Sequence, residues 1–302
     1  MIALSTCWQS SVTQSGRDLV ENLKALGFNE IELEYQITPA ILAELKSALK
    51  LSDVRPVSLR NFCPTPEVAP EPGADVWSFS SVDPEERKTA ITYTKRAIKL
   101  ASELGVEALI VHCGQVQMDP RTNELRETYD AGEIEAPAGQ RLLGEIKTER
   151  SANIGKCLER VEQCLEPLAA TASDAGVKIC LENQYYAHEI PSSDDLETLL
   201  SFLDKDTLGY WHDIGHASVQ ENLGLDSQTA FLGRYREKIF GVHLHDVVGY
   251  KDHLAPGDGD VDFAFVNENL PNDVLQVLEI QPAVTADQIR SGLNYLAKAG
   301  IT

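Results

Sequence analysis

The stretch Ile239-Phe240-Gly241-Val242-His243-Leu244-His245-Asp246 alternates apolar residues with glycine or histidine. Successive side chains of a β-strand point to opposite faces, so this period of two predicts a strand with one apolar and one polar face. The apolar face would consist of Phe240, Val242 and Leu244, and the polar face of Gly241, His243 and His245. In a closed barrel the first face would pack against helices, and the second would point at the barrel axis.

On both sides of this strand, short runs rich in β-forming residues alternate with longer runs at helical spacing, which is typical of βα units and a parallel sheet. The expected strands lie near residues 2–7, 30–34, 54–60, 107–113, 177–182, 207–213, 239–245 and 273–280. The expected helices lie near residues 15–26, 38–50, 83–104, 151–175, 193–203, 227–236, 262–270 and 285–298. This alternation predicts an α/β fold, a (β/α)8 TIM barrel forming a single domain over residues 1–302. The connections 61–82 and 114–150 are longer than a compact barrel needs, and we expect them to be active-site loops.

Side chains of metal-binding types stand at the carboxyl ends of the expected strands, where barrel enzymes keep their active sites. Strand alternation predicts that six side chains point toward the barrel axis: His112, Glu182, Trp211, Asp213, His243 and Glu279. No lysine stands near these carboxylates in the sequence, so they would repel one another unless a cation joined them, and the set predicts a metal site. For Glu32 and Glu34, a role in the site and a structural role as buried, hydrogen-bonded residues are equally consistent with the sequence. We interpret His188 as a loop residue and His212 as pointing toward the helices.

The composition excludes several classes of function. The chain of 302 residues carries 26 Lys+Arg against 47 Asp+Glu, a net charge of −21, which argues against a nucleic-acid partner because such proteins cluster basic side chains. No apolar run of about 18 residues predicts a membrane span, and the N-terminus lacks a secretory pattern. Six Cys without a CxxC motif do not indicate a disulfide framework, so we expect a cytoplasmic protein. Homo-oligomerisation is left open by the sequence.

Several motifs together resemble the xylose isomerase-like TIM barrels, which include sugar-phosphate isomerases/epimerases and the type-IV apurinic endonucleases. The resemblance covers nearly the whole chain. Its most specific match is the stretch His253-Leu254-Ala255-Pro256-Gly257-Asp258-Gly259-Asp260-Val261-Asp262-Phe263. The other matches are Gly27-Phe28-Asn29-Glu30-Ile31-Glu32-Leu33, Leu181-Glu182-Asn183, Asp213-Ile214-Gly215-His216 and Val242-His243-Leu244-His245-Asp246.

The resemblance implies one divalent metal ion held by Glu182, Asp213, His243 and Glu279, the same four residues that strand alternation brings together. Mixed oxygen and nitrogen ligands suit Mn, Mg, Co or Zn, so the identity of the metal stays open. His216 is similar to a family histidine that contacts substrate or a further metal, and His253 matches one that binds an additional zinc in the endonucleases. We expect His216, His112, Trp211 and His253 to bind substrate, and leave open a second metal near the three histidines.

Two positions depart from the endonuclease pattern. That branch has a histidine at the end of the third strand and an aspartate two residues before the histidine of the Gly-x-Gly loop, where this chain has Asn61 and Lys251. A lysine in place of a carboxylate ligand disfavours a further metal there. Together with the acidic charge, these departures make DNA repair a poor interpretation.

The arrangement fits proton transfer beside a carbonyl group, in which a metal stabilises the enediolate that forms. Glu182 and Glu279 would act as acid and base, as the resemblance implies for ketose 3-epimerases. We therefore expect an isomerase or epimerase, or a related lyase, that acts on a carbohydrate-like small molecule. A metal-dependent phosphodiesterase or endonuclease is the second hypothesis, and a metal-binding barrel without turnover is the third. The expected substrate is unphosphorylated, because no arginine cluster marks a phosphate site.

Overall fold

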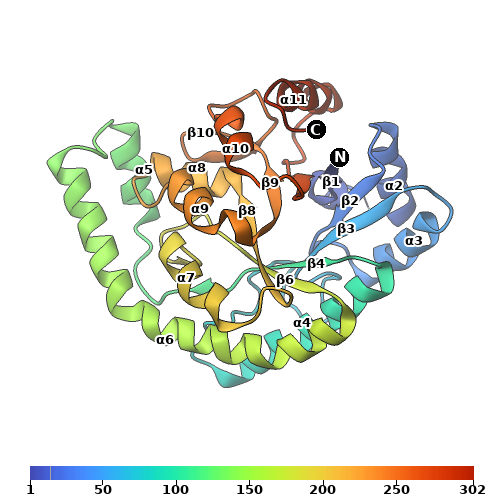
Figure 1. The fold of residues 1–302 in the computed structure, drawn as a ribbon, viewed down its shortest axis with the longest axis horizontal. Coiled ribbons are helices and arrows are strands. Elements are labelled where there is room, and N and C mark those ends of the chain that lie inside the picture. The colour runs from blue at the N-terminus through green and yellow to red at the C-terminus, as the bar shows by residue number, and fades with distance from the viewer. Residues whose placement is uncertain (14) are drawn as a thin grey trace.

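The computed structural model describes residues 1–13 and 15–302, and its centre is a closed barrel of parallel strands (Figure 1). Around the barrel the strands follow the order β1-β12-β9-β8-β6-β4-β3-β2. Their bounds are β1 Ile2–Ser5, β2 Glu30–Leu33, β3 Arg55–Arg60, β4 Ala108–Val111, β6 Lys178–Glu182, β8 Leu208–Asp213, β9 Ile239–Leu244 and β12 Leu275–Leu278. Each lies inside a strand expected from the sequence, so the predicted single-domain TIM barrel is confirmed.

The outer helices begin and end where the sequence carries capping signals. They are α2 Gly16–Ala25, α3 Pro39–Leu49, α4 Pro84–Leu104, α6 Pro137–Ala175, α7 Ser193–Phe202, α9 Gln228–Tyr235, α10 Phe263–Asn269 and α11 Ala286–Lys298. Asp83 caps α4 by accepting a hydrogen bond from the backbone N–H of Glu85, and Gly105 ends that helix in the left-handed conformation. None of the helices in the described ranges has the length and apolarity to cross a membrane.

Short elements lie in the connections between the barrel strands and helices. They are α1 Cys7–Ser10, β5 Gly114–Gln115, α5 Thr122–Asp130, β7 Glu189–Ile190, α8 Ile214–Asn222, η1 Arg236–Lys238, β10 Asp246–Val248 and β11 Lys251–Leu254. Strands β5 and β7 pair with each other, and β10 and β11 form a hairpin. All but η1 follow the carboxyl end of a barrel strand, so they surround the end where the metal-binding side chains gather.

The segment 114–150 corrects the prediction of a long loop. It contains α5 and the first part of α6, which together project from the barrel, and α6 continues round the barrel below (Figure 1). We call residues 122–150 the arm. Its apolar contacts join segments far apart in the chain: Leu125, Ile134 and Leu143 are buried, and Gly224 lies against Ile134 and Leu143. A short apolar stripe with distant partners explains why the sequence pattern resembled a loop.

The barrel interior is filled by a compact apolar cluster below the polar end. It consists of Ala3, Val57, Ala108, Ile110, Cys180, Trp211 and Val277. The Trp211 ring lies over Gly241, where a Cβ atom would approach it to 2.1 Å, so a side chain at this position would displace the indole. Phe240 differs from the prediction. The register shifts between Tyr210 and Trp211, and Phe240 packs against the interior cluster instead of the helices.

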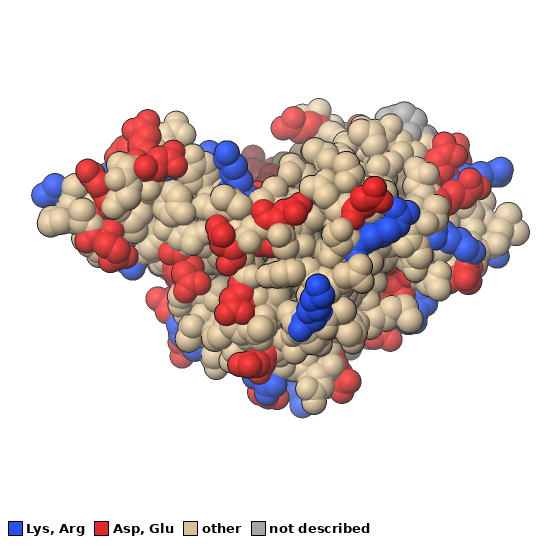
Figure 2. All heavy atoms as spheres, turned by 90° about the horizontal axis from the view of Figure 1, so that it is seen from above, with Lys and Arg blue, Asp and Glu red and all other residues tan. Residues whose placement is uncertain are grey.

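Charged side chains on the surface are mixed. On the face shown in Figure 2, acidic side chains are spread widely, and basic ones stand singly or in small groups among them. Several of the basic groups are paired, such as Lys24 with Asp53 and Lys46 with Glu103. This visible face therefore offers no continuous basic surface of the kind that follows a nucleic-acid backbone.

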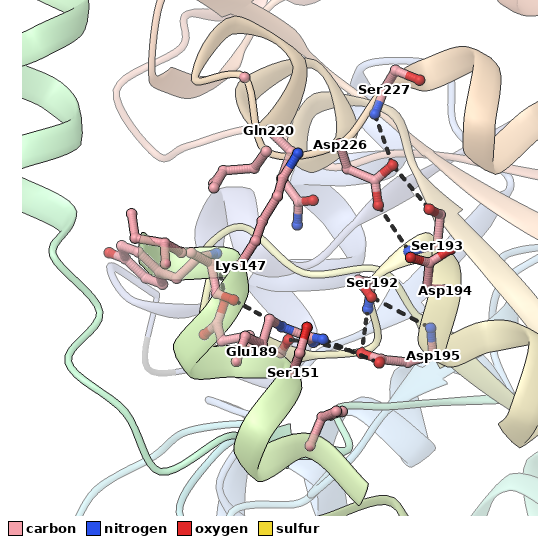
Figure 3. Close-up of a pocket in the computed structure, with 17 residues that line it drawn as sticks. Lys147, Ser151, Glu189, Ser192, Ser193, Asp194, Asp195, Gln220, Asp226 and Ser227 are labelled. Carbon is pink, nitrogen blue, oxygen red and sulfur yellow. Dashed lines mark hydrogen bonds and ion pairs between the residues drawn. The ribbon is translucent and has the colours of Figure 1, made fainter. Parts of the chain in front are cut away.

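A cavity of about 580 Å³ lies outside the barrel, between α6 and the start of α7. Figure 3 shows Lys147 and Ser151 of α6 on one side and Ser192, Ser193 and Asp195 on the other, with Asp226 accepting hydrogen bonds from Ser193 and Ser227. The Arg150 guanidinium closes this junction. It donates to the carbonyl oxygens of Ala187 (3.0 Å) and Glu189 (2.8 Å) and to the buried Asp195 carboxylate.

Arg150 therefore fixes the arm to the barrel, and Arg150→Ala should destabilise the protein by about 2–4 kcal/mol, because it leaves the Asp195 carboxylate buried without its cation. The measurement is the urea midpoint of unfolding. Arg234→Ala is the matched control: Arg234 also pairs with acidic residues of α7, Asp194 and Glu197, but at the surface. The control should cost less than about 1 kcal/mol. Equal midpoints for the two variants would contradict this role of Arg150.

Candidate functional site

Four side chains meet at the carboxyl end of the barrel. Glu182, Asp213 and His243 stand at the ends of β6, β8 and β9, and Glu279 directly follows β12. These strands are consecutive neighbours around the barrel. All four residues are buried, and one potential ligand atom from each lies within 4.8 Å of the others. We call this set the quartet. The structure thus brings together the four residues that the sequence predicted as metal ligands.

His243 is oriented by its two ring nitrogens. Nε2 lies 3.1 Å from a carboxylate oxygen of Glu32, which also accepts a hydrogen bond from Ser58 Oγ at 2.7 Å. Nδ1 lies 2.6 Å from Glu182 Oε1, 3.0 Å from Glu279 Oε2 and 3.5 Å from Asp213 Oδ2. Burial alone would lower the pKa of His243, but Glu32 and Glu182 raise it well above its usual value. If a metal ion took the place of the Nδ1 proton, Glu32 would still hold the proton on Nε2, as in many metal-binding histidines.

The donor set fits a divalent cation. Oxygen Oε2 of Glu279 is buried and makes no hydrogen bond within the described chain, although it faces His243. A buried carboxylate oxygen that accepts no hydrogen bond is costly, and a cation between it, Glu182, Asp213 and His243 would reduce that cost. Three carboxylates and one imidazole are ligands that several divalent metals accept. These residues could therefore hold a metal ion.

The Asp213-Ile214-Gly215-His216 motif is built around the start of α8. The Asp213 carboxylate caps that helix by accepting from the backbone N–H of His216 at 2.7 Å, and it lies 3.0 Å from His245 Nε2. The His245 ring fits against Gly215, where a Cβ atom would come within 1.9 Å of it. The glycine therefore admits the imidazole that holds Asp213 in place, so His245 supports a quartet residue from behind.

His216 and His253 stand together at the wall of the mouth. Their Nδ1 atoms lie 3.1 Å from the carbonyl oxygen of Asn183 and 3.2 Å from that of Glu279, respectively. Their Nε2 atoms lie 3.9 and 3.8 Å from Asp252 Oδ2. Burial and the charge of His245 lower the pKa of His253 to about 3, so this imidazole is neutral near pH 7. Both rings can accept hydrogen bonds from hydroxyl groups of a ligand.

The long Gly-Asp-Gly match is mainly structural. Asp246 is fully buried and accepts hydrogen bonds from the backbone N–H groups of Val247, Gly257 and Val261. Gly259 lies so close that a Cβ atom would be 2.4 Å from the Val247 carbonyl oxygen. This stretch therefore folds the connection after β9 so that His253 reaches the mouth, while its own aspartates stay away from the quartet.

Arg60 is the functional residue that the sequence analysis missed. Its guanidinium donates to Glu279 Oε1 and to Glu182 Oε2 (3.0 Å), and its side chain is almost completely buried. The sequence analysis considered only lysine as a partner of these carboxylates, and the structure shows that an arginine pairs with two of them. The register between β2 and β3 shifts at Val57, and this bulge puts both Val57 and Ser58 on the interior, followed by Arg60. Although burial opposes it, the charge of Arg60 holds the pKa of Glu182 well below its usual range.

His112 connects the quartet with the loop 61–82. Its Nε2 lies 2.8 Å from Glu182 Oε2 and its Nδ1 lies 3.1 Å from the Asp75 carboxylate. Burial would lower the pKa of His112, but Asp75 and Glu182 raise it to about 10. His112 faces the quartet as the sequence predicted, and Asp75 brings part of the long loop to the site.

A cavity of about 640 Å³ opens above these residues. Three of the expected substrate-binding residues, His112, His216 and His253, line it. The other lining residues include Tyr185, Tyr186, Arg126 of the arm, and Tyr250, Lys251 and Asp252 of the β10–β11 hairpin. Trp211 does not line the cavity. It is fully buried below His243, with ring centroids 5.2 Å apart, and therefore supports the quartet from beneath. Trp8 is also buried and donates to the Val284 carbonyl oxygen.

Two of the remaining candidates, Asn61 and His212, bond side chains outside the quartet. Asn61 points to α4, where it donates to Thr94 Oγ1. His212 faces the helices as predicted and bonds Tyr210 and Gln228. Glu34 is fully buried, and burial raises its pKa to about 7, whereas Glu32 contacts His243. The two glutamates that the sequence could not distinguish thus differ, because Glu32 alone supports a quartet residue.

Solved structures share this fold over almost the entire chain. A D-tagatose 3-epimerase-like protein aligns with a TM-score of 0.71 at 19% identity, covering 99% of this chain and 96% of the other. A 3-keto-D-glucoside 4-epimerase from E. coli gives 0.68 at 18% identity, covering 98% of each chain. A D-psicose 3-epimerase from Clostridium cellulolyticum H10 gives 0.68 at 14% identity, covering 99% of each. A search of curated proteins finds no match. The family model for the xylose isomerase-like TIM barrel matches residues 20–299, and the chain therefore belongs to that family.

Proposed function

We propose that this protein is a divalent-metal-dependent isomerase or epimerase, or a related lyase, for a sugar or polyol-derived carbonyl compound. The observation that carries the proposal is the convergence of two buried glutamates on His243 Nδ1, with Glu182 Oε1 at 2.6 Å and Glu279 Oε2 at 3.0 Å. Solved proteins of the same fold are described as sugar epimerases, which supports this reaction class. The cavity lined by His112, His216 and His253 has room for a sugar-sized molecule.

Within this proposal, Glu182, Asp213, His243 and Glu279 would hold the ion, which would supply Lewis-acid polarisation of the substrate carbonyl. Glu182 and Glu279 would move the proton on the carbon next to that carbonyl. Arg60 keeps the Glu182 carboxylate ionised in spite of burial, so the group is in the form that can accept a proton. Removal from one face and return to the other gives an epimer, and return to the neighbouring carbon gives an isomer.

The walls of the cavity favour a carbohydrate without phosphate groups. Its lining combines hydroxyl-accepting groups, His216, His253 and Asp252, with the tyrosine rings of Tyr185 and Tyr186. Lys251 and Arg126 are the basic residues lining the described cavity. One Arg126 donor is already bonded to Tyr185 Oη at 3.0 Å, and the guanidinium lies over the Tyr250 ring. Arg126 and Lys251 therefore bind an anion more weakly than the paired arginine donors that usually hold a phosphate group.

A phosphodiesterase or endonuclease is the alternative of a different class, and a barrel that binds metal without turnover is the third. Asn61 points away from the mouth, and Arg60 holds the outer oxygens of both glutamates. Lys251 and the acidic overall charge further disfavour a nucleic-acid substrate. The third alternative would leave the hydroxyl-accepting cavity beside the quartet without a role.

The first test is metal binding. Protein stripped with chelator should regain about one Mn²⁺ or Zn²⁺ per chain, and saturation at about 100 times Kd should add about 2.7 kcal/mol to the free energy of unfolding. Asp213→Asn should abolish this gain, because it removes a ligand charge. Glu189→Gln, which changes a cavity carboxylate outside the quartet, should retain it. A protein that takes up no metal and shows no thermal shift would sink the proposal.

The second test concerns turnover of ketoses and inososes. Glu182→Gln and Glu279→Gln should each lower kcat by roughly 10²–10⁴-fold, since each removes a proton carrier and a ligand charge. His216→Ala should keep the metal but raise KM, because this ring faces the cavity beside the quartet. Metal content is measured in parallel. Unchanged kcat in Glu279→Gln would remove Glu279 from the mechanism.

The third test separates the hydrolase alternative. Duplex DNA with an abasic site should remain intact when incubated with the purified protein and Mn²⁺, Mg²⁺, Co²⁺ or Zn²⁺. The readout is nicking on a denaturing gel. Metal-dependent nicking that disappears in Glu279→Gln would favour the endonuclease over the epimerase.

A further inference from the structure

The Arg60 guanidinium lies where three potential ligand atoms converge. Its Nη2 is 3.0 Å from Glu182 Oε2 and 2.9 Å from His112 Nε2, and its Nη1 bonds Glu279 Oε1. None of these atoms faces the centre of the quartet, which uses the other oxygen of each glutamate. Glu182 and Glu279 therefore each divide their oxygens between two positions: His243 Nδ1 lies beside one, and the guanidinium occupies the other.

The occupied position has the donors of a metal site. Two bridging carboxylates and one imidazole are a common ligand set for divalent ions, and His112 carries the outer carboxylate that such histidines usually have, because its Nδ1 lies 3.1 Å from Asp75. A second cation placed between these atoms would sit next to the quartet and share both glutamates with it. Paired metal ions that share carboxylates in this way are about 3.5–4 Å apart. A second ion would need the same three atoms that now contact the guanidinium, so the two could not be present together.

Charge balance explains why a cation belongs there. Glu32, Glu182, Asp213 and Glu279 are all buried at this end of the barrel, and one divalent ion in the quartet neutralises only part of their charge. Among residues 1–13 and 15–302, Arg60 is the one lysine or arginine that forms an ion pair with the quartet. An arginine is suited to this place because it stays charged when buried and its fork donates to two carboxylates at once.

We infer that Arg60 is a fixed cation built into the position of a second metal ion, so that this centre binds one ion only. Arg60 is thus a positioning residue: it joins Glu182 and Glu279 through one cation and leaves the other oxygen of each to the quartet. The inference rests on the proposed function in one respect, namely that the quartet binds a metal.

The experiment is a Mn²⁺ titration of chelator-treated full-length protein, with bound metal counted by elemental analysis and the electronic state followed by electron paramagnetic resonance. The wild type should saturate at one ion per chain and give the spectrum of an isolated Mn²⁺. Arg60→Ala should bind a second ion and show a spectrum of two coupled ions, because Glu182 Oε2, Glu279 Oε1 and His112 Nε2 all lose their contact with the guanidinium. Arg60→Lys should remain at one ion.

Three controls make the result specific. The double variant Arg60→Ala/His112→Ala should return to one ion, because it removes the nitrogen ligand of the second position. Arg55→Ala should behave as the wild type: Arg55 lies on the same strand and pairs with Glu30, but at the opposite end of the barrel. If Arg60→Ala does not fold, Arg60→His provides the opening with an added ligand, and it should also bind two ions.

The outcomes distinguish this inference from the proposed function. A wild-type protein that binds no ion contradicts both. A wild-type protein that gives the spectrum of two coupled ions contradicts the inference and leaves the proposed metal dependence standing. Retention of a single, uncoupled Mn²⁺ in Arg60→Ala and Arg60→His overturns the inference, because the position would then not be a metal site even when vacated.

Discussion

The burial of four carboxylates at one end of the barrel is the constraint on which the rest of this structure depends. Glu32, Glu182, Asp213 and Glu279 lie almost without exposed surface. Carboxylates in such surroundings repel one another and lose hydration, so they remain ionised only where cations and hydrogen-bond donors surround them. Arg60, His112, His243 and His245 meet that requirement in part. The quartet geometry, with an unpartnered oxygen on Glu279, leaves room for one more positive charge.

The apolar interior below this cluster keeps the polar side chains at one level. Trp211 covers Gly241 and lies against His243, so the imidazole rests on a rigid ring. Glycines 215 and 259 admit, respectively, the His245 ring and the fold of the loop that carries His253. The positions of the candidate ligands are therefore determined by close packing of neighbouring segments, and a change of a few atoms beneath them would be felt at the mouth.

Much of this arrangement could be predicted from the sequence, because strand alternation is a local property. A period of two identified which side chains of β6, β8, β9 and β12 face the axis, and the quartet follows from that alone. Alternation shows which face of a strand a side chain occupies, but not its height along the barrel axis. For this reason Trp211 was expected in the cavity, although its ring lies beneath the cavity. Arg60 could not be predicted because a bulge at Val57 adds one residue to β3, and the alternation of apolar and polar residues does not reveal it. The arm could not be predicted because the residues that its apolar side chains contact, such as Gly224, are far away in the sequence.

The cavity combines parts with different structural origins. The quartet stands on barrel strands, where backbone hydrogen bonds on both sides fix its geometry, whereas Arg126 enters from the projecting arm and Lys251 to His253 from a hairpin. The arm is joined to the rest of the molecule by the hydrogen bonds of Arg150, by the bond from Arg126 to Tyr185 and by the packing of Ile134 and Leu143 on Gly224. The residues for the reaction and those for ligand recognition therefore lie on different parts of the chain. The arm can change in length and sequence while the barrel end keeps its side chains. One barrel can in this way acquire different substrates by changes in a peripheral pair of helices.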